Sequence, residues 1–200
     1  MPNQTFRAFA LFVVCLTVLL AGCASKPKVF INQNPSADFG QYRTFGFQDQ
    51  LGTDSDQYAS LASSYLIAAT VREMKSRGYT ESANPDLIVN FNVQTEDKIR
   101  TTQTPTTGGY YGYRGCYGGY GGYGAYGGYE TRVTQFTEGT VNIDLVDASK
   151  QQLVWEGVIV GKVTDEVREN LQAVCEEVVA EIFGSYPYIA GNSEPQPIGK

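Results

Sequence analysis

Residues 108–129 form a tract of 22 residues that contains eleven glycines and eight tyrosines. Glycine loses more backbone freedom on ordering than any other residue, so this tract is a costly segment to build into a core. Glycine recurs at every third position from Gly109 to Gly127, but a collagen helix also needs imino acids between the glycines, and the tract has none. No Lys-Ser or Lys-Thr pair follows, which argues against a phosphate-binding loop. The tract is therefore a long insertion, and the core must come from the sequence on either side.

The segments that flank the tract alternate apolar and polar residues. Residues 87–94 and 140–146 both carry apolar side chains at every second position. Such a period of two, with a polar opposite face, is typical of antiparallel strands that are buried on one side. A turn at 147–152 leads into a return strand at 153–160, which contains Trp155. We therefore predict a three-strand meander with the tract inserted in its first connection.

A first helix is predicted at about residues 58–77. Gly78 follows it at the position where a helix end favours a left-handed residue. Its apolar face is spaced at i, i+3, i+4 and i+7 and comprises Ile67, Thr70, Val71 and Met74.

A second, closing helix should begin after Thr164 or Asp165 and end at Tyr186-Pro187. It carries the strongest helical pattern in the chain, a continuous apolar stripe that should face the core. The stripe consists of Val167, Leu171, Val174, Cys175, Val178 and Ile182.

Two short strands, at 29–31 and 44–47, precede the first helix. The order of elements predicts an α+β fold, in which an antiparallel sheet of about five strands packs both helices on one face. The tract of residues 108–129 interrupts this single domain between two strands.

The N-terminus has the build of a secretory signal. Arg7 is the one charged residue before an apolar run at 8–20, which is too short to span a bilayer. Leu20-Ala21-Gly22-Cys23 follows and resembles the bacterial lipobox. The resemblance implies a diacylglyceryl thioether on Cys23, cleavage before it, and a further acyl chain, such as palmitate, on the new amino group. Several acyl chains hold a protein on a membrane far longer than one.

These features divide the N-terminus into a signal peptide at 1–22 and a lipidated terminus with a short linker at 23–28. Ala24 and Ser25 follow the cysteine in place of Asp, which by the same resemblance implies the outer membrane, with the domain facing the periplasm. The alternatives are an ordinary signal peptide with a chance cysteine, or an uncleaved membrane helix.

Charge and composition exclude several classes of function. Without residues 1–22 the chain has 14 Lys and Arg, because Arg7 is removed from 15, against 21 Asp and Glu, a net charge of −7. An acidic chain of this kind is not expected to bind nucleic acid. The absence of histidine removes Ser-His-Asp and Cys-His catalysis and the usual histidine-bearing zinc sites. We therefore expect no catalytic residue, metal site or cofactor.

Two cysteines remain once Cys15 leaves with the signal and Cys23 is acylated. Cys116 lies in the tract and Cys175 on the apolar stripe. They form a disulfide in an oxidising periplasm or, alternatively, stay free, with Cys175 packed as a small apolar residue.

Several motifs resemble a family of bacterial envelope lipoproteins, the domain of unknown function 4136. The resemblance covers residues 29–188. The remaining residues, 189–200, are predicted to be a disordered tail from their own composition, which includes Pro195 and Pro197. The resemblance implies a single α+β lipoprotein domain, often with a Gly/Tyr-rich insertion, and it brings no activity with it. The motifs are Asp38–Phe45 (DFGQYRTF), Arg77–Tyr79 (RGY), Asn84–Phe91 (NPDLIVNF), Gly139–Asp147 (GTVNIDLVD), Leu153–Gly157 (LVWEG) and a terminal helix that ends before Pro187.

The tyrosines of the tract are the candidate binding residues. Their rings and hydroxyls could contact glycans, peptidoglycan or another protein from an adaptable backbone. The alternative is a tolerated insertion at a hairpin tip. The eight are Tyr110, Tyr111, Tyr113, Tyr117, Tyr120, Tyr123, Tyr126 and Tyr129.

Three other groups of residues are weaker candidates. Trp155 could stack on a sugar, although a single tryptophan in a sheet is more typical of the core. A polar strand face (Asn90, Asn92 and Gln94) and an aromatic group (Tyr42, Phe45 and Phe47) could together form a docking surface. Carboxylates that could serve a metal or acid–base chemistry are Asp86, Asp144, Asp147 and Glu156.

Taken together, the sequence favours a non-catalytic, membrane-anchored lipoprotein that binds an envelope protein or a cell-wall polymer such as peptidoglycan. The first alternative is an accessory lipoprotein subunit of an export or secretion assembly. A hydrolase that works with carboxylates alone is the second.

Overall fold

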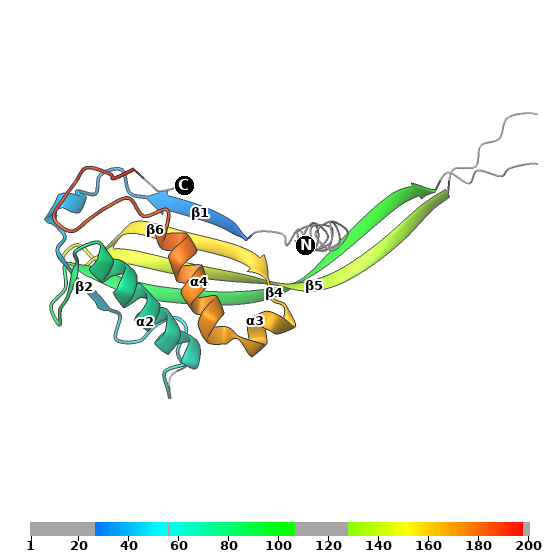
Figure 1. Ribbon diagram of the computed structural model, residues 1–200, viewed down its shortest axis with the longest axis horizontal. Helices are drawn as coiled ribbons and strands as arrows, with labels where there is room; N and C mark the ends of the chain where they lie inside the picture. Colours follow the sequence, from blue (N-terminus) through cyan, green and yellow to red (C-terminus); the bar gives the residue numbers. More distant parts are fainter. Residues whose placement is uncertain (1–26, 56, 107–127, 198–200) are drawn as a thin grey trace, which may run out of the picture.

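The strands of the described chain form one mixed sheet in the order β1-β6-β5-β4-β2-β3 (Figure 1). The computed structural model describes residues 27–55, 57–106 and 128–197. The strands are β1 (Lys28–Gln33), β2 (Thr44–Phe47), β3 (Thr80–Glu81), β4 (Leu87–Thr106), β5 (Gly128–Asp147) and β6 (Gln152–Lys162). The helices are a 3-10 turn, η1 (Phe39–Gln41), and the α-helices α2 (Leu61–Ser76), α3 (Asp165–Glu169) and α4 (Leu171–Phe183).

The α+β class is confirmed, but the prediction of an antiparallel sheet of about five strands was wrong. β2 runs parallel to β4, with Phe45 beside Leu87, and parallel to β3, with Thr44 beside Thr80. The reason is that α2 carries the chain back across the sheet after β2, so the next strand runs in the same direction as β2. β3 adds a sixth strand, and its two residues are too few to show any period.

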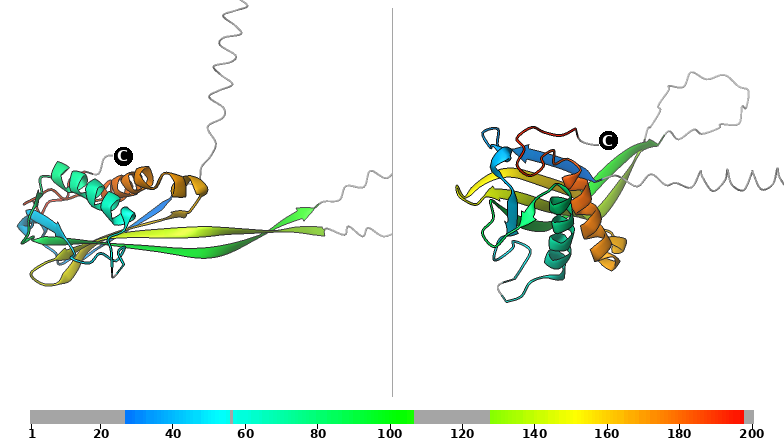
Figure 2. Two further views of the ribbon diagram at one scale, coloured as in Figure 1. Left: turned by 90° about the horizontal axis from the view of Figure 1, so that it is seen from below. Right: turned by 60° about the vertical axis from the view of Figure 1, so that its left-hand side comes forward.

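The helices α2 and α4 lie side by side over one face of the sheet, and no helix of the described residues lies on the opposite face (Figure 2). The ends of α2 follow local chemistry. Ser60 caps its first turn, because its Oγ accepts from the Ser63 amide at 3.0 Å, and the helix therefore begins three residues later than predicted. Gly78, at φ +83°, adopts the left-handed conformation expected after the helix.

The closing helix differs from its prediction. Asn170, at φ −119° and ψ 43°, leaves the helical region and divides it into α3 and α4. Because of this break, the face of α4 that packs on the sheet differs from the predicted apolar stripe. Leu171, expected in the core, is 37% exposed, while the buried residues of α4 are Cys175, Val179, Ile182 and Phe183.

Aromatic side chains fill the space between the sheet and α4. Trp155 is fully buried, as expected for a core residue, and its ring lies 5.9 Å from Phe183 and 5.0 Å from Tyr186 between centroids. A Cβ at Gly157 would lie 2.3 Å from a methyl of Ile182, so only glycine lets α4 approach β6 this closely.

The chain after α4 returns to the body of the domain and extends the ordered structure past residue 188. The Ala190 amide donates to the Arg77 carbonyl at 3.0 Å, and the Gly191 amide donates to the Tyr42 carbonyl at 2.9 Å. Tyr188 stacks on Phe39 with ring centroids 3.8 Å apart. These contacts hold the C-terminal segment on the N-terminal part of the domain.

Candidate functional site

Two cross-strand rows of side chains occupy the helix-free face of the sheet. In the first row, Asn90, Asp144, Glu156 and Asn32 are register partners across β4, β5, β6 and β1. In the second row, the partners are Asn92, Asn142, Val158 and Phe30. We call the six polar residues of these rows the amide–carboxylate ladder: Asn32, Asn90, Asn92, Asn142, Asp144 and Glu156.

Hydrogen bonds connect the two rows of the ladder. Asn32 donates to Oε2 of Glu156 at 2.8 Å, and Asn142 donates to Oε1 of the same carboxylate at 3.1 Å. Asn92 approaches Oδ2 of Asp144 at 3.5 Å. At the β4 end, the Gly52 amide donates to Oδ1 of Asn90 at 3.1 Å, so the loop after β2 closes this side of the ladder. The amides are therefore held in fixed orientations around two carboxylates.

The Asp144 carboxylate has the least favourable surroundings of the six ladder residues. Its burial, and then the charge of Glu156 on the neighbouring strand, raise the pKa of Asp144 above its usual value. Its Oδ1 atom is buried and has no hydrogen-bond partner in the described structure. A buried acceptor without a donor is costly, so Asp144 is held in the ladder at an energetic cost.

Phe30 gives the same face an exposed aromatic ring. It is 52% exposed on the edge strand β1 and lies in register with Val158 and, beyond it, Asn142. An aromatic face beside fixed amides and carboxylates can contact an apolar surface and hydroxyl groups of one ligand together.

The four carboxylates considered from the sequence divide into two pairs. Asp144 and Glu156 lie side by side on the ladder. Asp86 and Asp147 serve the fold instead. Oδ2 of Asp86 accepts from the Arg43 amide at 2.8 Å and the Thr44 amide at 2.9 Å.

Asp147 is almost fully buried in the β5–β6 turn. Its Oδ1 accepts from the amides of Ser149 at 2.9 Å and Lys150 at 3.0 Å, and its Oδ2 accepts from the Tyr42 hydroxyl at 2.9 Å and from Nζ of Lys150 at 3.0 Å. Burial alone would raise the pKa of Asp147, but the Ser149 hydroxyl, which donates to Oδ1 at 2.7 Å, and these other donors outweigh it and hold the pKa well below its ordinary value. No group of three or more Asp, Glu or Cys side chains among the described residues is placed to hold a metal ion.

The predicted aromatic docking group was wrong, since Tyr42 and Phe45 are buried in the core and Phe47 packs against it. Asn90 and Asn92 do lie on the helix-free face, as the alternation predicted. The sequence interpretation missed Phe30 as an exposed ring, because a strand expected over only three apolar residues gives no phase to tell its two faces apart.

The predicted tyrosine site follows the end of a long hairpin. β4 and β5 continue as a two-stranded ribbon that projects from the body (Figure 1). We call residues 97–106 and 128–137 of this ribbon the arm. Tyr129 lies near its end and is 71% exposed. The other seven candidate tyrosines, Cys116 and the lipidation candidate Cys23 lie outside the described residues, while Gly128 and Tyr129 belong to β5 rather than to a loop.

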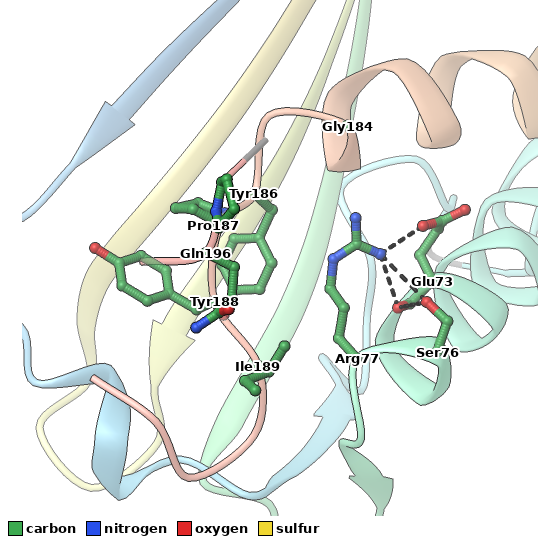
Figure 3. A pocket seen from close by; sticks show the side chains of 10 residues that line it. Glu73, Ser76, Arg77, Gly184, Tyr186, Pro187, Tyr188, Ile189 and Gln196 are labelled. Atoms are coloured by element: carbon green, nitrogen blue, oxygen red, sulfur yellow. Dashed lines mark hydrogen bonds and ion pairs between the residues drawn. The ribbon is translucent and has the colours of Figure 1, made fainter. Parts of the chain in front are cut away.

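A pocket of about 380 Å³ lies between the end of α2 and the C-terminal segment (Figure 3). Arg77 lines it, but its guanidinium is already engaged. It donates to the Glu73 carboxylate at 2.6 Å and to the Phe183 carbonyl at 2.7 Å, and it lies 5.4 Å from the centroid of the Phe183 ring. We assign this pocket a structural role, in which Arg77 ties α2 to the end of α4.

Two further observations concern the remaining cysteine and the helices. Cys175 is buried and free, and its burial raises the pKa of its thiol. None of the helices in the described ranges is both long enough and apolar enough to cross a membrane.

Comparison with known proteins gives a family and a fold. The family model described as domain of unknown function (DUF4136) matches residues 29–188. A crystal structure of a DUF4136 family protein from Bacteroides thetaiotaomicron VPI-5482 superposes with a TM-score of 0.51 at 17% sequence identity, over 84% of this chain and 100% of that one. At that identity the likeness concerns the fold alone.

Two other solved structures are more distant. A PDZ domain protein from Parabacteroides distasonis ATCC 8503 gives a TM-score of 0.46 at 16% identity, over 88% of this chain and 40% of that one. A PelC dodecamer from Paraburkholderia phytofirmans gives 0.44 at 13% identity, over 82% and 99%. No curated protein matched the chain.

Proposed function

The chain belongs to the DUF4136 family, and from this premise we propose that it is a non-catalytic, membrane-anchored lipoprotein that faces the periplasm and binds a cell-wall polymer. The binding surface in this proposal is the helix-free face of the sheet. The observation that carries it is the amide–carboxylate ladder beside the exposed ring of Phe30. The anchor in this proposal is Cys23, at the end of the lipobox-like Leu20-Ala21-Gly22-Cys23.

The chemistry of the ladder suits a glycan chain. Sugar hydroxyls both donate and accept, so they can donate to the carboxylates of the ladder while they accept from its asparagine amides. The face of a pyranose ring that carries C–H bonds is apolar and can lie on the Phe30 ring. The two carboxylates disfavour a densely anionic polymer, because each would meet like charges at close range.

Binding without catalysis fits this geometry better than hydrolysis. Glycoside hydrolysis requires two carboxyl groups that flank the bond to be cleaved, one to protonate the leaving oxygen and one to act as nucleophile or to activate the attacking water. Asp144 and Glu156 instead lie next to each other on adjacent strands of an open sheet face, and Glu156 already accepts two asparagine amides.

Binding to the cell wall can be tested by co-sedimentation of the purified full-length protein with peptidoglycan sacculi. We expect Phe30→Ala, and Asn142→Ala combined with Glu156→Gln, to weaken binding by about tenfold or more, because these residues form the contact surface. The matched control is Gln172→Ala combined with Glu176→Gln, an exposed amide–carboxylate pair at 3.2 Å on α4, and it should bind like wild type.

The outcomes of this experiment show whether the ladder or the tyrosine tract is the binding surface. Wild-type protein that fails to sediment with sacculi would overturn the proposal, as would ladder variants that bind normally. Replacement of residues 107–127 by a short Gly-Ser turn should leave binding intact. If binding follows this replacement and not the ladder variants, the tyrosines of the tract are the binding surface instead.

The lipid anchor has its own prediction. We expect Cys23→Ser to yield a protein without acyl chains, which is either unprocessed or released from the outer membrane, because the thioether forms on the Cys23 sulfur. Mass spectrometry of the N-terminal peptide of wild type should show an acylated Cys23. A mature N-terminus at another, unmodified residue would contradict the anchor.

The hairpin arm favours a second candidate function, an accessory subunit of an export or secretion assembly. A two-stranded ribbon that leaves the body of its domain is suited to reach another protein. Cross-linking in the native envelope followed by purification would reveal a single stoichiometric protein partner if this function holds, whereas peptidoglycan fragments would support the first proposal.

A further inference from the structure

The arm lacks support from the rest of the described structure. It contains ten cross-strand pairs, from Asp97–Thr137 to Thr106–Gly128. β6 ends at Lys162, which pairs with Glu138 just before the arm begins, and the Val163 amide donates to the Thr137 carbonyl at 2.9 Å. From Ile99 to Pro105 and from Gly128 to Gln135 the residues are exposed. A two-stranded ribbon is at best marginally stable alone in water and needs a further strand or a packed face.

The face of the arm that carries Lys98, Arg100, Thr134 and Phe136, which we call the closed face, is covered near the body of the domain by interactions within the chain. Lys98 bridges Glu96 at 2.7 Å and Glu138 at 3.7 Å. The ring of Phe136 is covered from two sides, by Arg100 at 5.6 Å and by Lys162 at 5.0 Å from the ring centroid. Lys98, Arg100 and Phe136 of the closed face therefore find partners within the chain.

The other face of the arm is bare and almost uncharged. Ile99, Val133 and Tyr129 lie on it and are 70%, 64% and 71% exposed. Its one charged residue, Asp97, accepts from the Thr137 hydroxyl at 2.7 Å. By register, the bare face consists of Asp97, Ile99, Thr101, Gln103, Pro105, Tyr129, Thr131, Val133, Gln135 and Thr137.

We propose that the bare face of the arm packs against the same face of a second copy of this chain. Charge is the first reason for this occupant. The chain carries a net charge of −6, so two copies repel each other over most of their surface, and an uncharged face allows them to meet. Symmetry is the second reason. A two-fold contact brings the same patch together from both copies, and the bare face has the exposed Val133 at its centre, in register with the uncharged Thr101.

The size of the arm sets the strength of this contact. At about 3.3 Å per residue, ten pairs span roughly 33 Å, and a face about 10 Å wide buries on the order of 700 Å² in two copies. This lies below the roughly 1,200 Å² of stable complexes, so the contact is reversible and forms where the local concentration is high. It also supplies a packed face, which the ribbon does not obtain from the described residues.

Cysteine cross-linking of the full-length chain in the native envelope tests this contact. In a Cys116→Ser background, Thr101→Cys lies at the centre of the bare face, and Thr102→Cys is the matched control on the opposite face. After mild oxidation, we expect covalent homodimers from Thr101→Cys at about ten times the yield from Thr102→Cys. Adding Val133→Asp to Thr101→Cys should abolish the dimer, whereas adding Thr134→Asp, on the closed face, should leave it.

Several results would overturn the second copy as the occupant. These are equal dimer yields from the two cysteines, no dimer from either, a dimer that survives Val133→Asp, or a Thr101→Cys adduct to a different protein. All four positions lie on the exposed ribbon away from the core, and an unchanged Tm for each variant confirms that the fold is intact.

Discussion

Val179→Asp is expected to unfold the protein, while Leu171→Asp on the same helix leaves it folded. Val179 is fully buried between α4 and the sheet, and a carboxylate there would lose its hydration without gaining a partner. Such a substitution costs more than about 4 kcal/mol, which is comparable to the whole stability of a small domain. Leu171 is 37% exposed at the start of α4, so its replacement buries no charge.

Circular dichroism and thermal unfolding of both variants provide the measurement. Val179→Asp should show no cooperative transition, and Leu171→Asp should melt within a few degrees of wild type. Equal loss in both variants would mean that the closing helix packs with the uninterrupted stripe expected from the sequence, and not with the face that follows the break at Asn170.

Asp147→Ala is expected to lower the free energy of unfolding by about 3 kcal/mol. It removes the acceptor of two backbone amides in the β5–β6 turn and of the buried Tyr42 hydroxyl, and donors left without an acceptor carry a cost of about 1–3 kcal/mol each. Asp147→Asn should cost less, because an amide oxygen still accepts from Ser149 and Lys150. Urea unfolding at pH 7 should give the highest free energy of unfolding for wild type, a lower value for Asp147→Asn and the lowest value for Asp147→Ala.

The stabilisation by Asp147 should depend on pH with a definite sign. Because its folded pKa lies below the unfolded value of about 3.9, its contribution is complete above that pH and is lost as the pH falls below it. The difference in stability between wild type and Asp147→Asn should therefore shrink between pH 5 and pH 2. A difference that stays constant over this range would show that the ionised carboxylate is not what stabilises the turn.

Tyr42 should make the folding stability depend on pH in the opposite direction, with a loss of stability as the pH rises. Its burial, and then its hydrogen bond to Asp147, raise the pKa of Tyr42 to about 12. An unfolded tyrosine ionises near pH 10, so this part of the stability is lost as the pH rises from about 10 toward 12. Tyr42→Phe should be less sensitive to pH over that interval.

The sequence predicted the centre of the fold better than its edges. Alternation in residues 87–94 and 140–146 identified β4 and β5, because one face of each strand is buried against helices and the other is not. The direction of β2 could not be predicted, because a strand of four residues has the same sequence pattern whether it pairs in parallel or antiparallel. The direction depends instead on α2, which determines where the chain re-enters the sheet. The strand prediction also ended at Gln94, because most residues of the ribbon beyond it are exposed and show no alternation of apolar and polar side chains.

The candidate site was predicted only in part for a related reason. Asn90, Asn92 and Asp144 could be placed on polar strand faces from their spacing alone. Their contact with Glu156 and Asn32 depends on the strand order β4-β5-β6-β1, which places the N-terminal strand next to β6. No local pattern encodes that neighbour, so Phe30 and Asn32 could not be assigned to the same surface.

The same strand order determines when the N-terminal strands can fold. β1 finds its partner only in β6, where Lys28 lies beside Val160, and β2 finds a long partner only in β4. A chain made from its N-terminus therefore releases residues 28–81 before these partners exist, with Phe39, Tyr42 and Phe45 still exposed to water. Contacts between such distant residues form slowly, and an aromatic segment that waits for them is prone to aggregate. The β4–β5–β6 meander is thus the framework that residues 28–81 must await before their strands can pair.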